Sequence, residues 1–327
     1  MGLRRTATAA AITVLMASAV PASSEETVRL GITGPSEAPS AADVLGELLA
    51  GFAPPPRLAV ETVAGPEAVR GLKPELRRGD VDAAELPLGA LARESALFAA
   101  DQIPRLAATA GARRDLHDRL DRILSRRLTE DGLVLVALLP GAPLGILSRR
   151  RFEAPADLRG ARVWAPTAAT RRIAELLGEA AGGDVRPVVA PAEADVLLVS
   201  AGAALRVPAF ATTDGPRRAE GWTFQSVPDW QPMRAIVVTE RMLGRLGGGS
   251  GARIDNWRST RSERWRAAAS ERAGRSEREL EEAGAALATA SPAMVEAFTE
   301  IGRRMSAEWL PGAGADGASL LGGRGEE

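Results

Sequence analysis

Three observations predict an α/β protein of two lobes. Short apolar strands and amphipathic helices alternate along most of the chain, which is typical of a mostly parallel sheet covered by helices. Proline and glycine interrupt the chain twice, near 141–145 and between 227 and 234. Two interruptions around one α/β block favour two lobes joined by two strands, with a hinged cleft between them. A highly charged, mostly helical segment ends the chain.

Apolar periodicity and turn residues place the individual elements. Ser40 is expected to cap the first helix, and Gly79 to end the second. Strands are expected at 27–33, 57–63, 81–86, 132–139, 161–165, 195–200 and 234–239, and helices at 40–51, 71–79, 116–129 and 168–178. These elements predict a first lobe of 27–142 with 234–256, a second lobe of 143–233, C-terminal helices over 257–312 and a tail of 313–327.

Two further features concern the C-terminal helices. Gly284 and the pair Ser291-Pro292 are expected to divide them into two. Their arginines alternate with glutamates, which favours a solvated amphipathic face over a nucleic-acid surface.

Composition excludes several functions. The 327 residues suffice for two domains, and the 45% hydrophobic and 25% charged fractions are those of a globular protein. A net charge of −1 attracts neither nucleic acid nor anionic lipid. The chain has one histidine and no cysteine. Histidine-based metal sites, Ser-His-Asp triads, thiol nucleophiles and disulfides therefore lack the side chains that they need. We therefore expect no enzymatic activity, no metal and no cofactor.

The N-terminus has the layout of a secretory signal. Arg4 and Arg5 precede an uncharged run to Val20, and small residues follow. The run is too short and too rich in alanine to anchor in a bilayer about 30 Å thick. We expect export to the periplasm with cleavage near Ala22.

One short stretch, GARVWAPTAATRRIAELLG at 160–178, suggests an anion site. A strand runs into Pro166 and Thr167, and a helix follows. Free backbone N–H groups and the helix dipole at such a junction favour a negatively charged group. The strand ends in Trp164, which offers a flat apolar wall. The expected ligand has one anionic or strongly polar end and a less polar body.

Three segments resemble a known family, and they occur in that family's order. Residues 71–107, the turn Asp157 to Gly160 and residues 280–321, which include Glu308-Trp309 and the AGADG element, are similar to DctP-type solute receptors of tripartite ATP-independent periplasmic (TRAP) transporters. The resemblance implies a two-lobed periplasmic-binding-protein-like fold with hinge strands and a long C-terminal bracing helix. It also implies a receptor that closes on a small organic acid and delivers it to a membrane permease, with no contact to the membrane except through that permease.

The chain departs from the family at two places. The family usually has an arginine that binds the ligand carboxylate where this chain has Trp164. The family usually also has a helix between Pro187 and Leu205. About one helix is missing there in this chain, near 188–195.

The candidate ligand-binding residues are Trp164, Thr167, Arg206, Trp230, Arg234 and Glu85. Trp164 faces the cleft or packs between the lobes. Arg234, at the second crossing after Trp230, is either a displaced carboxylate clamp or an inter-lobe salt bridge. Glu85 matches an acidic residue near the family's pocket mouth, and its alternative is an N-cap or a surface charge. Arg206 follows the strand 195–200.

Three other arginines near Trp164 are weaker candidates. Arg162 could replace the family's arginine only if the register slips by two residues, because it shares a strand face with Trp164. Arg171 and Arg172, one turn into the helix, are expected to face solvent.

Three alternatives to a transport receptor stay open. A degenerate family member could sense a ligand or bind a partner without transport. A cluster receptor of an ABC-type transporter fits the C-terminal motifs less well. Against an exported enzyme on the same architecture, the chain has a single His, no Cys and no Tyr, and shows no clustered acid pair.

Overall fold

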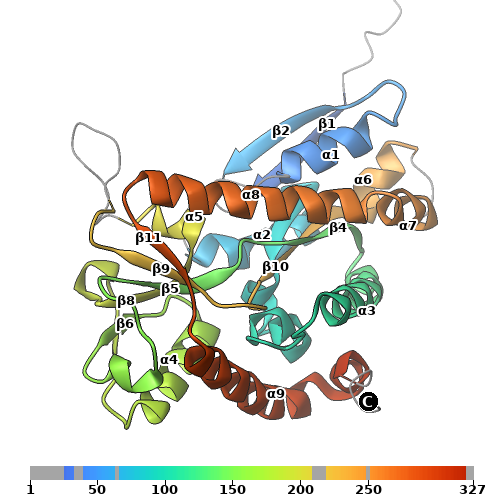
Figure 1. The fold of residues 1–327 in the computed structure, drawn as a ribbon. Coiled ribbons are helices and arrows are strands. Elements are labelled where there is room, and N and C mark those ends of the chain that lie inside the picture. Colours follow the sequence, from blue (N-terminus) through green and yellow to red (C-terminus); the bar gives the residue numbers. More distant parts are fainter. Residues whose placement is uncertain (1–25, 33–39, 63–65, 208–218, 248–250, 322–327) are drawn as a thin grey trace, which may run out of the picture.

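The computed structural model describes residues 26–32, 40–62, 66–207, 219–247 and 251–321. Within them the chain forms two mixed sheets, one on each side of the molecule, with helices packed on both (Figure 1). The segment predicted to be a signal peptide, 1–22, lies outside the described residues.

The first sheet, called sheet A here, has five strands in the order β2-β1-β3-β10-β4. β1, β2 and β3 are parallel to one another, whereas β10 is antiparallel to both β3 and β4. Its strands are β1 (Thr27–Ile32), β2 (Arg57–Thr62), β3 (Ala83–Pro87), β4 (Leu133–Pro140) and β10 (Met233–Thr239).

The second sheet, called sheet B here, has six strands in the order β11-β9-β5-β8-β6-β7. β5 is antiparallel to both of its neighbours, and the other neighbouring pairs are parallel. Its strands are β5 (Leu144–Ser148), β6 (Arg162–Trp164), β7 (Arg186–Val188), β8 (Val196–Ser200), β9 (Thr223–Ser226) and β11 (Ala286–Thr289).

The helices lie around these sheets. The α-helices are α1 (Ala41–Leu49), α2 (Pro66–Arg78), α3 (Ala110–Thr129), α4 (Ala168–Ala180), α5 (Ala201–Ala204), α6 (Glu240–Arg245), α7 (Gly251–Ser259), α8 (Ser262–Glu282) and α9 (Pro292–Leu321). The short 3-10 helices are η1 (Leu88–Leu91), η2 (Ala96–Gln102), η3 (Pro155–Leu158) and η4 (Pro191–Glu193).

Local chemistry explains two of the predicted helix ends. Ser40 caps α1: its Oγ accepts the Asp43 N–H at 3.0 Å, and the Asp43 side chain accepts the Ser40 N–H. Gly79 follows α2 with a φ of +87°, a left-handed conformation that favours glycine.

Two C-terminal helices connect the sheets. α8 packs against β4 of sheet A and against α5 and β11 on the sheet B side, and it runs along the whole molecule in Figure 1. On another side, α9 contacts η2 and α3 as well as α4 and η3. The largest apolar cluster is continuous from Leu86 and Leu138 in sheet A to Leu198 in sheet B, and includes Phe298 of α9. The predicted two-lobed α/β fold with a long C-terminal helix is confirmed.

Several predicted details differ from the structure. The sheets are mixed rather than mostly parallel, because β10 in sheet A and β5 in sheet B are antiparallel to both of their neighbours. Strand β11 lies between α8 and α9, in a segment predicted to be helical, where pairing with β9 decides the conformation. The helical backbone of α9 breaks at Gly314, whose φ is +59°, and then resumes to Leu321, past the predicted start of the tail at 313.

The connection between β7 and β8 is short. It contains only the 3-10 turn η4, in agreement with the missing helix inferred from the sequence. Within the described ranges, none of the helices has the length and apolarity needed to cross a bilayer.

Candidate ligand-binding site

Two extended segments, here called the first and second crossings, connect the two sheets from β4 to β5 and from β9 to β10. The helix α8, which leads to β11 of sheet B, is a further connection. The two crossings are joined by hydrogen bonds. The Gly141 N–H donates to the Pro232 carbonyl at 2.7 Å, and the Leu144 N–H to the Trp230 carbonyl at 2.9 Å. The Gln231 side chain adds a bond to the Gly141 carbonyl at 2.7 Å. The crossings therefore form one two-stranded hinge.

Strand pairing places the carboxyl ends of the parallel strands beside this hinge. In sheet A, Arg234 at the start of β10 pairs with Pro87 at the end of β3. In sheet B, Leu144 at the start of β5 pairs with Ser200 at the end of β8, and β6 runs parallel to β8. Ligands of open α/β sheets bind outside the carboxyl ends of such strands.

The structure brings Arg234 and Glu85 together where β3 ends and β10 begins. This end of the strands beside the hinge is called the sheet A edge here, and the corresponding end of β6 and β8 the sheet B edge. Arg234 Nη1 lies 2.8 Å from Glu85 Oε1, and the two side chains are 7% and 11% exposed. Both belong to sheet A, so the pair is not an inter-lobe salt bridge. Glu85 is buried within β3, and its alternative reading as an N-cap or a surface charge is wrong. A buried pair of this kind holds a guanidinium at the hinge with part of its charge balanced.

Trp164 and Thr167 lie at the sheet B edge. Trp164 ends β6, pairs with Leu197 of β8 and is half-buried against an apolar cluster formed by β5, β8, β9 and α8. Thr167 caps α4: its Oγ1 accepts the Thr170 N–H at 3.1 Å, while Thr170 Oγ1 accepts the Thr167 N–H at 2.9 Å. Neither residue carries a charge.

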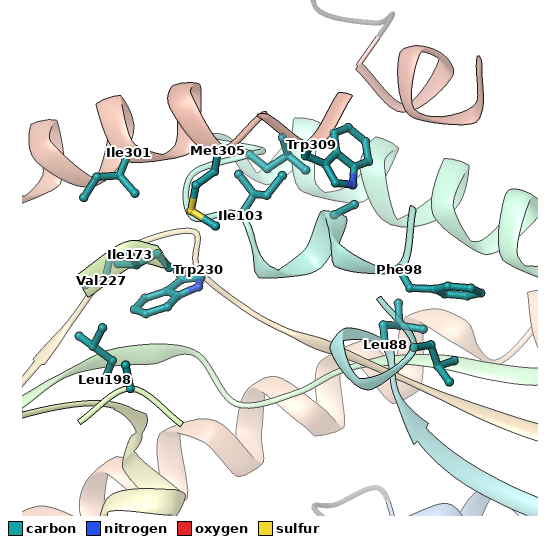
Figure 2. Close-up of a cluster of buried hydrophobic side chains, with 14 of the residues drawn as sticks. Leu88, Phe98, Ile103, Ile173, Leu198, Val227, Trp230, Ile301, Met305 and Trp309 are labelled. Atoms are coloured by element: carbon teal, nitrogen blue, oxygen red, sulfur yellow. The ribbon is translucent and has the colours of Figure 1, made fainter. Parts of the chain in front are cut away.

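Trp230 does not join them. It is 1% exposed and lies in the core, where its ring centroid is 5.6 Å from that of Phe298 in α9. Figure 2 shows it close to Val227 and Ile173, below Met305. Trp230 is therefore a packing residue beside the hinge. Its burial depends on the contact with α9, and the local sequence does not reveal that contact.

The remaining arginines lie elsewhere. Arg206 is exposed and lines a groove with Arg272 and Glu279 of α8, apart from Arg234. Arg162 is exposed and binds Asp195 through two nitrogens, at 2.8 and 3.1 Å. Arg172 is not simply solvent-facing, because it pairs with Glu308 of α9 at 2.6 Å.

The candidates from the sequence do not include one further buried carboxylate at the hinge. Asp101, at the end of η2, is 5% exposed, and its Oδ2 accepts the Met233 N–H at 2.5 Å. Burial raises the pKa of Asp101 to about 7, against the opposing effect of that hydrogen bond. An aspartate inside an apolar run is a detectable feature, but the contact with Met233 joins positions 132 residues apart.

The described part of the chain contains no group of three or more His, Cys, Asp or Glu side chains placed to hold a metal ion. The arrangement around the hinge instead offers one paired guanidinium on one side and an aromatic wall with a helix N-terminus on the other.

Comparison with solved structures identifies the fold of the chain. It matches no protein-family model and no curated protein. It is similar to the solved structure of DctP7, a Bordetella pertussis extracytoplasmic solute receptor binding pyroglutamic acid, with 23% identity and a TM-score of 0.72 over 90% of this chain and 98% of that one.

Two other solved structures are similar. A marine metagenome TRAP solute binding protein specific for pyroglutamate has 18% identity and a TM-score of 0.71, over 91% of this chain and 98% of that one. A TRAP periplasmic solute binding protein from Chromohalobacter salexigens, with bound D-glucuronate, has 13% identity and a TM-score of 0.68, over 90% and 98%. The chain thus has the fold of the TRAP periplasmic solute-binding proteins.

Proposed function

We propose that the protein is an extracytoplasmic solute receptor. It binds a small organic acid in a cleft between the lobes 27–142 with 234–256 and 143–233, and delivers it to a TRAP-type membrane permease. The observation that carries this proposal is the two-stranded hinge with the carboxyl ends of both sheets beside it, in a chain that shares its fold with solute receptors over about 90% of its length.

The charge distribution supports an anionic ligand. Arg234 supplies a guanidinium at the sheet A edge, and a carboxylate that enters the cleft competes with Glu85 for it. The first turn of α4 supplies backbone N–H donors next to the Thr167 cap. The anionic end of the ligand binds these two groups.

The neutral part of the ligand fits Trp164. An indole at the end of β6 offers a flat face to an apolar or ring-shaped body, where an arginine would instead bind a second carboxylate. Pyroglutamate, which two of the similar receptors bind, combines one carboxylate with a small neutral ring. We therefore expect monocarboxylates with a compact body to bind better than small dicarboxylates.

The location and the partners of the protein follow from the same proposal. The layout of the first 22 residues favours export, and a receptor of this fold acts in the periplasm. Its partners are the organic acid and the permease subunits, and the protein itself carries out no catalysis.

The proposal is tested by a thermal-shift screen of the mature protein against pyroglutamate, other monocarboxylates, dicarboxylates, sugar acids and neutral analogues. A ligand present at about a hundred times its Kd stabilises the folded state by about 2.7 kcal/mol. Titration calorimetry and small-angle scattering on each positive compound should give saturable binding and a smaller radius of gyration. If no compound binds while the protein is folded, the transport function is wrong.

A further inference from the structure

A second cavity lies beside the hinge, outside the site described above. It has a volume of about 350 Å³, within the range of about 300–1,000 Å³ found for small-molecule pockets. Its walls come from the end of η2, the N-terminal half of α3, the second crossing and α8. It has none of Trp164, Thr167, Arg234 or Glu85 in its walls.

The floor of this cavity, here called the hinge cavity, is apolar. It contains the buried side chains of Ile103 and Leu106 and the half-buried Leu116 and Met233. Ala267 of α8 lies in the opposite wall and is exposed. The apolar floor favours a ligand with an apolar body.

Three arginines line the mouth, and two of them are held in place. Arg113 of α3 pairs with Asp229, which also pairs with Arg105. Arg266 of α8 pairs with Asp118 at 3.1 Å. Arg114 also lines the cavity, and within the described part of the chain no ion pair is formed by it.

A buried histidine fixes the position of Arg266. His117 Nε2 lies 3.0 Å from the Leu138 carbonyl, and its Nδ1 lies 3.1 Å from Arg266 Nη1. A carbonyl only accepts and a guanidinium only donates, so Nε2 carries the proton and the imidazole is neutral. Burial and the Arg266 charge both lower the pKa of His117. His117 therefore orients the Arg266 guanidinium without adding a second positive charge.

The acidic groups do not balance these cations. Arg105 and Arg113 share Asp229, Arg266 pairs with Asp118, and Glu263 is exposed on α8, so four arginines including Arg114 meet three of these acidic groups. Asp101 is buried in the wall, and its Oδ1 has no hydrogen-bond partner among the described residues. Since burial raises the pKa of Asp101 to about 7, this carboxyl is largely neutral below neutral pH. The mouth then has an excess of positive charge.

We propose that the hinge cavity is a second ligand site, which takes a monoanionic compound with an apolar, ring-sized body. Its anionic group binds Arg114 and the guanidiniums of Arg113 and Arg266. Its body lies on Ile103, Leu106 and Met233. Because Asp229 and Met233 belong to or adjoin the second crossing, the ligand contacts the hinge as well as α3 and α8.

Calorimetry of the mature protein with indole-3-acetate tests this proposal, with indole-3-acetamide as the neutral analogue of the same shape. The acid should bind saturably and at least about tenfold more tightly than the amide, since one charge-assisted contact contributes about 1.5–3 kcal/mol. Ala267→Trp fills the cavity from an exposed position and should remove this binding. Arg114→Gln should weaken it about tenfold.

A matched control separates this site from the cleft. Trp164→Ala changes the cleft and should leave indole-3-acetate binding to the hinge cavity intact, including when the cleft is saturated with its own ligand. Binding should strengthen between pH 8 and pH 6, as Asp101 becomes neutral. The other titratable groups at the cavity are Arg113, Arg114, Arg266, Asp229, Glu263 and His117, with Asp118 beside Arg266.

Equal binding of acid and amide, or unchanged binding in Ala267→Trp, would overturn the proposal, as would the absence of saturable binding. Loss of binding in Trp164→Ala alone would assign the probe to the cleft and also overturn it. Circular dichroism of each variant verifies that a lost signal does not come from unfolding.

Discussion

The two edges that adjoin the hinge differ in their chemistry. The edge of sheet A carries a buried ion pair, Arg234 with Glu85, and a buried aspartate, Asp101, lies beside it on Met233. The edge of sheet B carries the uncharged side chains of Trp164 and of Thr167, which caps the N-terminus of α4.

This difference indicates how the two lobes could recognise different parts of one ligand. A guanidinium fixes a carboxylate strongly and directionally, whereas an indole and backbone donors tolerate different neutral bodies. We infer that sheet A supplies most of the affinity for the anion and sheet B selects the rest of the ligand. Five changes test this difference between the two sheets, in order of decreasing expected effect.

The largest effect is expected from Arg234→Ala. It removes the guanidinium and leaves Glu85 buried without its partner, which costs about 3–5 kcal/mol of folding stability. Anion affinity should fall about 100-fold, as expected for a lost charge-assisted contact of about 3 kcal/mol. Chemical denaturation and calorimetry measure the two effects separately.

The double variant Arg234→Met with Glu85→Met is the control. It removes both charges, so stability should recover while binding stays lost. Anion binding that persists in the double variant would show that sheet A is not the charged side of the cleft.

Asp101→Asn tests the buried charge near sheet A. Folding raises the pKa of Asp101 from 3.8 to about 7, so the folded state loses stability as the pH rises through this window, and the full cost is present above pH 7. The amide avoids this cost. We expect it to stabilise the protein by about 2–4 kcal/mol at pH 8 and by little at pH 4, from about 1.4 kcal/mol per pKa unit.

Asp195→Asn, in sheet B's neighbourhood, should behave in the opposite way. The Arg162 hydrogen bond lowers the pKa of Asp195, so its contribution to stability is present above the unfolded pKa and is lost as the pH falls. Urea titrations of both variants between pH 4 and 8 measure these slopes. If the stability of both variants, relative to the unsubstituted protein, changed with pH in the same direction, the assignment of the buried charge to Asp101 beside sheet A would be contradicted.

Trp164→Ala should weaken ligand binding about tenfold, because stacking on an aromatic face contributes about 0.5–1.5 kcal/mol beyond the buried area. Trp164→Phe should retain most of the affinity. Trp164→Arg should shift preference towards small dicarboxylates, since the guanidinium offers a second carboxylate site. Competition calorimetry with a monocarboxylate and a dicarboxylate measures the shift, and an unchanged preference would remove Trp164 from the cleft.

Thr167→Ala should have the smallest effect. Loss of an N-cap costs about 1 kcal/mol of stability, and Thr167→Ser should restore it because the hydroxyl is retained. The backbone donors of α4 remain, so affinity should change less than about threefold. A larger loss of binding would mean that the Thr167 hydroxyl contacts the ligand itself.

Local signals in the sequence predicted most of the elements correctly. Alternation of apolar residues identified β1, and a continuous apolar run identified the buried β4. The capping residue Ser40 identified the start of α1, and Pro166 with Thr167 identified the start of α4. The short strands β5, β7, β9 and β11 were missed because three to five residues carry too little periodicity. Pairing with neighbours far away in the chain decides their conformation.

The candidate site was predicted only in part. Arg234 and Glu85 were both named from their places in the sequence, but their contact joins positions 149 residues apart, and no local pattern encodes it. Trp230 and Arg206 were named on the same basis, and tertiary packing puts the first in the core and the second beside α8.

By itself the sequence determined the α/β class, the two crossings, the helix ends and the presence of an aromatic residue where the resembled family has an arginine, because periodicity, backbone restrictions and side-chain capping act over a few residues. The tertiary structure alone decided which strands pair, which charges neutralise each other and where a cavity remains. These depend on α8 and α9 packing across both sheets, and on burial that raises the pKa of Asp101. Such long-range contacts form only when distant segments meet.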